Sequence, residues 1–214
     1  MNGTLLDIEN LYLEKGRPLI VCDCDEVLMQ FVAGLEIYLK TQALYLDLTS
    51  FRLMGNIRRQ GSKEALNDDE VRACLRNFFV DHTDSLMPVA GAAEALKRLS
   101  QKAQIVVLTN LPPAQKDIRA RNLARHDMAY PVIANEGLKG PAVAQMAKAV
   151  DAPIIFLDDI AHHIASVAQA CPHSKRIHFV ADVRLQTLVQ KAEYAHARCD
   201  SWDKALAFIE ETLA

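Results

Sequence analysis

Four short apolar runs, each followed directly by polar residues, set the pattern of this chain. They cover residues 18–22, 105–108, 153–157 and 177–180. The runs are rich in isoleucine and valine and are too short for helices, so each predicts a strand that is buried on both faces. The residues that follow the runs are Asp23, Thr109 with Asn110, Asp158 with Asp159, and Ala181 with Asp182.

Segments with apolar residues at helical spacing separate these runs. They cover residues 92–99, 114–125, 141–150 and 160–170, and a last one begins near Ser201, a residue type that caps helix N-termini. Strands that alternate with helices of this length pair in parallel through right-handed crossovers. The pattern therefore predicts an α/β fold with a doubly wound, mainly parallel, Rossmann-like sheet, in which ligands bind beyond the carboxyl ends of the strands.

One segment interrupts the alternation of strands and helices. Residues 31–46 and 69–79 have helical patterns, and no run between them has the pattern of a buried strand. We predict that residues 31–85 form a small α-helical cap. The core would then consist of residues 1–30 and 86–214.

Composition and charge narrow the class of protein. The chain of 214 residues is 50% hydrophobic and 24% charged, as is typical of a globular protein. Its formal net charge of −3 lacks the basic excess that nucleic-acid polymers attract. The N-terminal segment has no basic start or apolar run, and no apolar stretch approaches about 18 residues, so we expect a cytoplasmic protein without a membrane partner. Five cysteines without CxxC spacing predict reduced thiols, and monomer and homodimer remain equally open.

Acidic residues gather at the predicted strand ends. Asp23 and Asp25 lie two residues apart, so in extended backbone their side chains point the same way and repel unless a cation lies beside them. Asp158 and Asp159 end another strand and can meet them at one edge of the sheet. Magnesium prefers oxygen ligands and bridges to phosphate groups. We therefore predict a Mg²⁺ site formed by Asp23, Asp25, Asp158 and Asp159.

A phosphate group at such a site needs hydrogen-bond donors and positive charge around its oxygens. Thr109 offers a hydroxyl and a backbone N–H, and Asn110 follows it. Lys139 offers an ammonium just before a helix whose N-terminus favours anions. Arg58 and Arg59 in the cap are further candidates for substrate binding, although arginines on helical surfaces are often only solvated.

In their order and spacing, Asp23-x-Asp25, Thr109, Lys139 and Asp158-Asp159 resemble the four motifs of the haloacid dehalogenase-like superfamily. Taken singly, each motif has an ordinary explanation, such as a turn-forming acid or an exposed lysine, whereas the ordered set is far more specific. The resemblance extends over about residues 18–182. The inserted segment is similar in position to the helical caps of that superfamily.

The resemblance implies a phosphatase that acts on a small phosphorylated substrate. Asp23 would be the nucleophile that forms an aspartyl-phosphate, and Asp25 would act as general acid and then as general base. Dehalogenases are similar but lack the second acid, so Asp25 favours phosphate esters. Thr109 and Lys139 would bind the transferring phosphoryl group. The magnesium ligands would be the Asp23 carboxylate, the Asp25 backbone carbonyl, Asp158 and Asp159.

Two positions depart from the usual motifs. Glu26 stands where a small residue often follows the second aspartate, and His162 stands where the fourth motif often has another acid. Both keep open the alternative of a non-catalytic phosphate-binding or regulatory protein that retains the fold. A signalling receiver domain also uses acids, a threonine and a lysine, but in receivers the acidic pair comes first, whereas here Asp158-Asp159 comes last.

Overall fold

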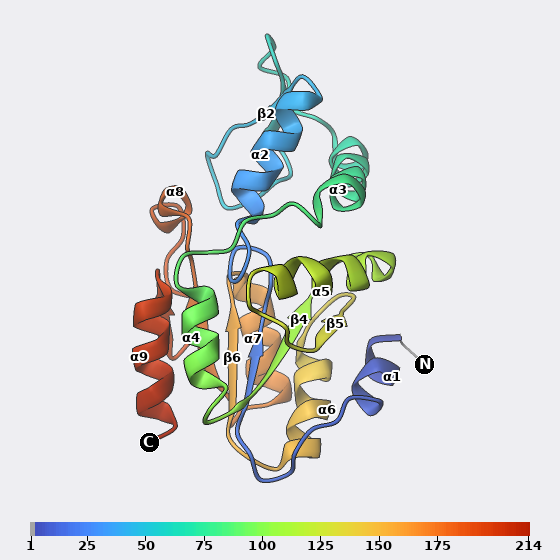
Figure 1. The fold of residues 1–214 in the computed structure, drawn as a ribbon. Helices are drawn as coiled ribbons and strands as arrows, with labels where there is room; N and C mark the ends of the chain where they lie inside the picture. Colours follow the sequence, from blue (N-terminus) through green and yellow to red (C-terminus); the bar gives the residue numbers. More distant parts are fainter. Residues whose placement is uncertain (1–2) are drawn as a thin grey trace.

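A six-stranded parallel sheet lies at the centre of the computed structural model, which describes residues 3–214 (Figure 1). The strand order is β5-β4-β1-β6-β7-β8, and every neighbouring pair is parallel. The predicted α/β class with a doubly wound parallel sheet is confirmed. The strands are β1 (Leu19–Cys22), β4 (Gln104–Thr109), β5 (Val132–Ala134), β6 (Ile154–Asp158), β7 (Lys175–Phe179) and β8 (Ala197–Cys199).

Helices cover both faces of this sheet. Successive strand residues point to opposite faces, so the strands contribute side chains to two separate apolar clusters. Ile20 and Cys22 of β1 pack in a cluster with α4, α5 and α9, whereas Leu19 and Val21 pack in a cluster with α1, α6 and α7. The helices are α1 (Gly3–Glu9), α4 (Ala92–Leu99), α5 (Lys116–Arg125), α6 (Gly140–Val150), α7 (Ala161–Ala170), α8 (Val183–Gln186) and α9 (Trp202–Thr212).

Strand β1 is the point at which the chain reverses its direction across the sheet. It pairs with β4 on one side and with β6 on the other, so that Val21 lies beside both Val106 and Phe156. Such a switch point leaves a crevice beyond the carboxyl ends of the strands. Asp23 follows β1 directly and Asp158 ends β6, so the topology alone brings these two residues to one place.

Most core elements agree with the sequence pattern, but β5 and β8 are not predicted by it. Each has three residues, which is too few to show a period, and β8 contains Arg198. Both occupy the edges of the sheet. Ser201 caps α9 as predicted, because its side chain accepts a hydrogen bond from the Lys204 N–H.

The segment of residues 31–85 contains strands as well as helices. The helix predicted over residues 31–46 ends earlier, and a two-stranded antiparallel sheet separates the two helices. The prediction of a purely α-helical cap is therefore corrected, since strands of three residues leave no periodic signal. The elements are α2 (Phe31–Thr41), β2 (Leu44–Leu46), β3 (Ile57–Arg59) and α3 (Asp68–His82).

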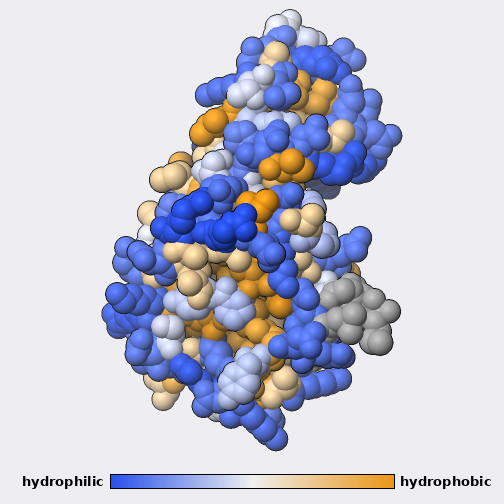
Figure 2. Space-filling model, turned by 45° about the vertical axis from the view of Figure 1, so that its right-hand side comes forward, coloured by the Kyte–Doolittle hydropathy of each residue, from blue (hydrophilic) through white to orange (hydrophobic). Residues whose placement is uncertain are grey.

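These four elements, which we call the cap, stand beyond the end of the large sheet (Figure 1). The space-filling view shows a smaller upper body joined to a broader lower body through a narrower waist (Figure 2). The two bodies share one apolar cluster, in which Tyr38 and Phe78 of the cap join Leu28 and Val89. Among residues 3–214, no helix has the length and apolar character needed to span a bilayer.

Candidate active site

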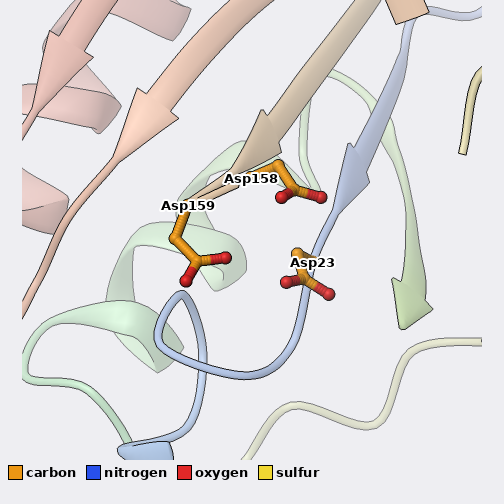
Figure 3. Close-up of side chains that lie close together, drawn as sticks. All are labelled: Asp23, Asp158 and Asp159. Atoms are coloured by element: carbon orange, nitrogen blue, oxygen red, sulfur yellow. The ribbon is translucent and has the colours of Figure 1, made fainter. Parts of the chain in front are cut away.

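Three buried aspartates converge where β1 and β6 end. Asp23, Asp158 and Asp159 each offer a carboxylate oxygen, and these oxygens lie within 4.8 Å of one another. Figure 3 shows the three carboxylates turned toward a common point, with Asp23 beyond β1 and the other two at the end of β6. The structure thus brings together residues that lie 135 positions apart in the chain, as the strand pattern predicts.

Lys139 joins this cluster from the start of α6. Its Nζ lies 2.6 Å from Asp23 Oδ1 and 2.7 Å from Asp158 Oδ2, and its side chain is 1% exposed. Burial opposes the charge of this lysine, but Asp158 and Asp23 outweigh burial and raise its pKa. Lys139 is therefore a permanent cation, and two of its three N–H groups are directed to carboxylates.

The carboxylates carry more negative charge than this ammonium offsets. Burial raises the pKa of Asp23 to about 6, against the opposing effect of Lys139. The pKa of Asp159 is raised well above its ordinary value by burial and by the neighbouring Asp158 and Asp23. Asp159 Oδ1 is buried and has no hydrogen-bond partner among residues 3–214. An oxygen-rich, electron-rich site of this kind fits a hard divalent cation.

Close packing of α6 against α7 sets the position of Lys139. Gly140 is the next residue, and a Cβ at that position would lie 2.4 Å from the Ser166 carbonyl oxygen. The Gly140 N–H instead donates to Ser166 Oγ at 3.1 Å. A glycine is therefore required at the start of α6 if Lys139 is to reach the acids.

Asn110, a predicted phosphate ligand, fixes the loop that precedes Lys139. Its Nδ2 donates to the Gly137 carbonyl at 2.9 Å, and its Oδ1 accepts from Asn135 Nδ2 at 2.7 Å. Thr109 is fully buried at the end of β4, and its Oγ1 has no hydrogen-bond partner in the described part of the chain. An unsatisfied hydroxyl at the end of the strand that neighbours β1 leaves a donor for a ligand.

Asp25 pairs with a residue that the sequence pattern does not reveal. Arg119 on α5 is fully buried, and its Nη2 lies 2.9 Å from Asp25 Oδ1. Burial raises the pKa of Asp25, and the Arg119 guanidinium opposes that rise. The Asp25 carboxylate lies outside the three-aspartate cluster, so the prediction that Asp25 binds metal concerns only its backbone carbonyl and stays a prediction. In the sequence, Arg119 occupies a helical position like that of any exposed arginine, so the pattern does not indicate that it is buried or pairs with Asp25.

Glu26 links the loop after β1 to the cap. Its backbone has a φ of 60°, in the left-handed region that favours glycine. Its Oε1 accepts a hydrogen bond from the Val32 N–H at 2.7 Å, at the start of α2. Burial raises the pKa of Glu26 to about 7, against this hydrogen bond. On the other side of the same loop, Trp202 Nε1 donates to the Val27 carbonyl at 2.9 Å.

A cavity of about 220 Å³ lies between these core residues and the cap. Asp23, Asp25, Lys139 and Asp159 line it, together with other residues of both bodies. His163, which also lines it, is a second residue that the sequence pattern misses. Burial lowers the pKa of His163 to about 3, so its ring is neutral.

The structure does not bring the two predicted cap arginines to this cavity. Arg58 Nε pairs with Asp47 Oδ2 at 2.9 Å, and Arg59 Nη2 pairs with Glu70 Oε1 at 2.5 Å. Both belong to β3; Asp47 follows the partner strand β2 directly, and Glu70 lies in the first turn of α3. Among the residues that line the cavity, the arginine is Arg52. The expectation that Arg58 and Arg59 bind substrate finds no support in this geometry.

Comparison with solved structures identifies the fold. A conserved haloacid dehalogenase-like protein of unknown function from Agrobacterium tumefaciens matches with a TM-score of 0.64 at 15% identity, over 93% of this chain and 100% of that one. A HAD family hydrolase from Deinococcus radiodurans, solved with phosphate and sodium, matches with a TM-score of 0.61 at 14% identity, over 94% and 98%. A HAD hydrolase from Bacillus subtilis bound to magnesium matches with a TM-score of 0.60 at 10% identity, over 92% and 99%.

This chain is therefore a protein with the haloacid dehalogenase-like fold, and the fold implied by the four sequence motifs is confirmed. No family model and no curated protein sequence matches it. At identities of 15% or less, the likeness concerns the fold, so the chemistry has to be argued from the site itself.

The Asp25–Arg119 pair predicts an asymmetric effect on stability. Asp25→Asn leaves a guanidinium that is fully buried and cannot lose its proton, which we expect to cost on the order of 2 kcal/mol, below the range for fully buried pairs because Asp25 is 18% exposed. Arg119→Met should cost less, since Asp25 can take up a proton. The double variant should be more stable than Asp25→Asn. Urea unfolding measures all three.

Arg98→Met, which breaks an exposed pair with Glu210, serves as the control and should cost less than about 1 kcal/mol. An Asp25→Asn variant as stable as the unmodified protein would show that Arg119 does not depend on Asp25.

The aspartate cluster predicts a cation effect that depends on pH. The pKa of Asp23 is raised, so without a cation its buried charge lowers stability above pH 6, and protonation relieves this as pH falls through about 6. A divalent cation offsets the charge at pH 7.5 but must displace a proton at pH 5.5. We expect the rise in melting temperature caused by MgCl₂ over EDTA to shrink from pH 7.5 to pH 5.5. An equal rise at both values would contradict the cluster as a metal site.

Proposed function

We propose that this protein is a Mg²⁺-dependent phosphomonoester hydrolase that acts on a small phosphorylated substrate through an aspartyl-phosphate at Asp23. The observation that carries the proposal is the contact of Asp23 with Lys139 inside a buried acidic cluster, at the floor of a cavity. An ionised carboxylate with a cation beside it is a competent nucleophile toward phosphorus. Dehalogenation is less well supported, because Asp25 supplies a leaving-group acid that halide does not need.

In the first half-reaction, an Asp23 carboxylate oxygen attacks phosphorus and the bond from phosphorus to the ester oxygen breaks. The electron pair of that bond stays on the ester oxygen, which takes a proton from the Asp25 carboxyl. Burial raises the pKa of Asp25, which helps this carboxylate to take up the proton that it then donates, and Arg119 pairs with the carboxylate that remains. Lys139 has a third N–H, which would bind an oxygen of the transferring group.

In the second half-reaction, water attacks phosphorus and loses a proton to the Asp25 carboxylate. The bond from phosphorus to Asp23 breaks, so inorganic phosphate leaves and both aspartates return to their starting states. Lys139 stays charged throughout and neutralises Asp23 as it is released. The Thr109 hydroxyl, buried without a partner among the described residues, would donate to a phosphate oxygen.

Magnesium is the proposed cation. Asp23, Asp158 and Asp159 would hold it, and when bound it would neutralise charge on the phosphoryl oxygens. The Bacillus subtilis structure, described as bound to magnesium, and the Deinococcus radiodurans structure, described as binding phosphate and sodium, support this proposal.

We further infer that the chain belongs to the haloacid dehalogenase-like hydrolases. In that assignment, residues 1–30 and 86–214 form the catalytic core and residues 31–85 form its cap.

The proposal predicts that Asp23→Asn abolishes phosphate release, because an amide cannot attack phosphorus. Phosphate released from a panel of phosphomonoesters with MgCl₂ is the measurement, and loss of at least a thousandfold is expected. Asp117→Asn on the exposed surface of α5 is the matched control and should keep full activity. EDTA should remove the activity and added MgCl₂ should restore it.

Two outcomes would count against a hydrolase. Turnover by Asp23→Asn at the unmodified rate would remove Asp23 as the nucleophile. Binding of phosphate esters without turnover across the whole panel would favour the alternative of a non-catalytic phosphate-binding or regulatory protein, which the replacement of the usual small residue by Glu26 keeps open.

A further inference from the structure

The cavity above Asp23 has two chemically different halves. Its floor comes from the core and carries charge, with Asp23, Asp25, Lys139 and Asp159. Its roof consists of apolar side chains, most of them partly buried and most of them from the cap. The apolar roof residues are Phe31, Leu48, Phe51, Leu53, Phe79 and Leu185.

The roof offers few polar atoms to a ligand. Ser50 and Arg52 are the polar residues that the loop between β2 and β3 contributes to the cavity. The Ser50 hydroxyl already accepts a hydrogen bond from Asn56 Nδ2 at 3.1 Å. A sugar or polyol placed against the apolar side chains of this roof would lose water from hydroxyls that those side chains cannot pair with, and each unpaired hydroxyl costs about 1–3 kcal/mol.

The roof loop is held in place before any ligand arrives. Asn56 is buried, and its Nδ2 also donates to the carbonyls of Ser50 at 3.0 Å and Arg52 at 2.7 Å. Its Oδ1 accepts from Thr49 Oγ1 at 2.9 Å. Phe51 lies within this clamped stretch, so its backbone is held where its ring lines the cavity. A preformed apolar wall of this kind is typical of a binding pocket.

The size of the cavity limits its occupant. About 220 Å³ is below the roughly 300–1,000 Å³ of sites that enclose drug-sized ligands. After a phosphate group has taken the charged floor, room remains for a single ring or a short branched chain. A nucleotide or a lipid would extend beyond it.

We propose that the substrate is the monophosphate ester of a small apolar alcohol, with one ring or a short alkyl chain that packs against Phe51 and its neighbours. This inference rests on the proposed function and specifies its leaving group. The transfer is the one described above: the ester oxygen keeps the electron pair of its bond to phosphorus, takes the proton of Asp25 and departs as a neutral alcohol. Neutral release into an apolar pocket leaves no buried charge behind.

The test compares two esters of primary alcohols that each carry a six-membered ring. Cyclohexylmethyl phosphate has no hydroxyls, whereas glucose 6-phosphate carries several. With MgCl₂, kcat/KM for cyclohexylmethyl phosphate should exceed that for glucose 6-phosphate by about a hundredfold, because a polar analogue leaves several hydroxyls unpaired. Equal values, or a preference for the sugar, would overturn the inference.

Two variants connect this preference to the roof. Phe51→Ala should reduce the ratio of the two kcat/KM values by about tenfold, since the ring contact is lost. Phe208→Ala, a half-buried phenylalanine of α9 outside the cavity, is the matched control and should leave the ratio unchanged. An unchanged ratio in Phe51→Ala would also overturn the inference.

Acetyl phosphate separates the two levels of the proposal, because its small acyl group does not need the roof. Hydrolysis of acetyl phosphate together with a preference for glucose 6-phosphate would keep the hydrolase assignment and reject the apolar substrate class. No hydrolysis of acetyl phosphate or of either ester would reject both.

Discussion

Lys139 lies between Asp23 and Asp158 in a buried contact that ties together three separate parts of the chain. Asp23 follows β1, Asp158 ends β6, and Lys139 precedes α6. A buried ion pair stabilises only when its geometry is close and its remaining charge is met, since desolvation otherwise exceeds the attraction. Contacts of 2.6 and 2.7 Å satisfy the first condition. The excess of carboxylates leaves the second condition unmet by Lys139 alone, and the cation proposed above would meet it.

This constraint explains features of the fold that lie away from the acids. Lys139 reaches the cluster only if the start of α6 comes close to α7, which Gly140 permits through its contact with Ser166. The loop before Lys139 must also be fixed, and Asn110 and Asn135 bind the Gly137 carbonyl for that purpose. Gly140 and the two asparagines therefore all help to position Lys139 for its contact with the two aspartates.

The sequence predicts the floor of the site better than its surroundings, for a physical reason. The ends of buried strands are visible as apolar runs that stop at polar residues, and parallel topology then places those ends together. The strand-end pattern therefore predicts Asp23, Asp158 and Asp159 as residues of one site. It does not find Arg119, because a buried arginine on α5 has the same spacing as an exposed one.

Cap contacts are equally hidden from sequence reasoning, because they depend on how two short strands pair. The basic run around β3 predicts substrate-binding arginines, yet Arg58 and Arg59 have cap acids as partners, and the loop before that strand supplies the roof through Phe51. Net charge in a loop is therefore a poor guide to what the loop presents to a ligand. The register in which β2 pairs with β3 decides which residues face the cavity, and strands of three residues do not reveal this register in the sequence.

Glu26 gives a reason why cap and core act as one site. A non-glycine residue in the left-handed region costs about 1 kcal/mol, and at Glu26 a side-chain contact offsets this cost. The Glu26 carboxylate accepts the Val32 N–H at the first turn of α2, where a negative charge is favoured by the helix dipole. The loop that carries Asp23 and Asp25 therefore also holds the base of the cap helix. Because Phe31 and Val32 begin that helix and line the cavity, the loop that carries Asp23 also sets the position of this part of the cavity wall.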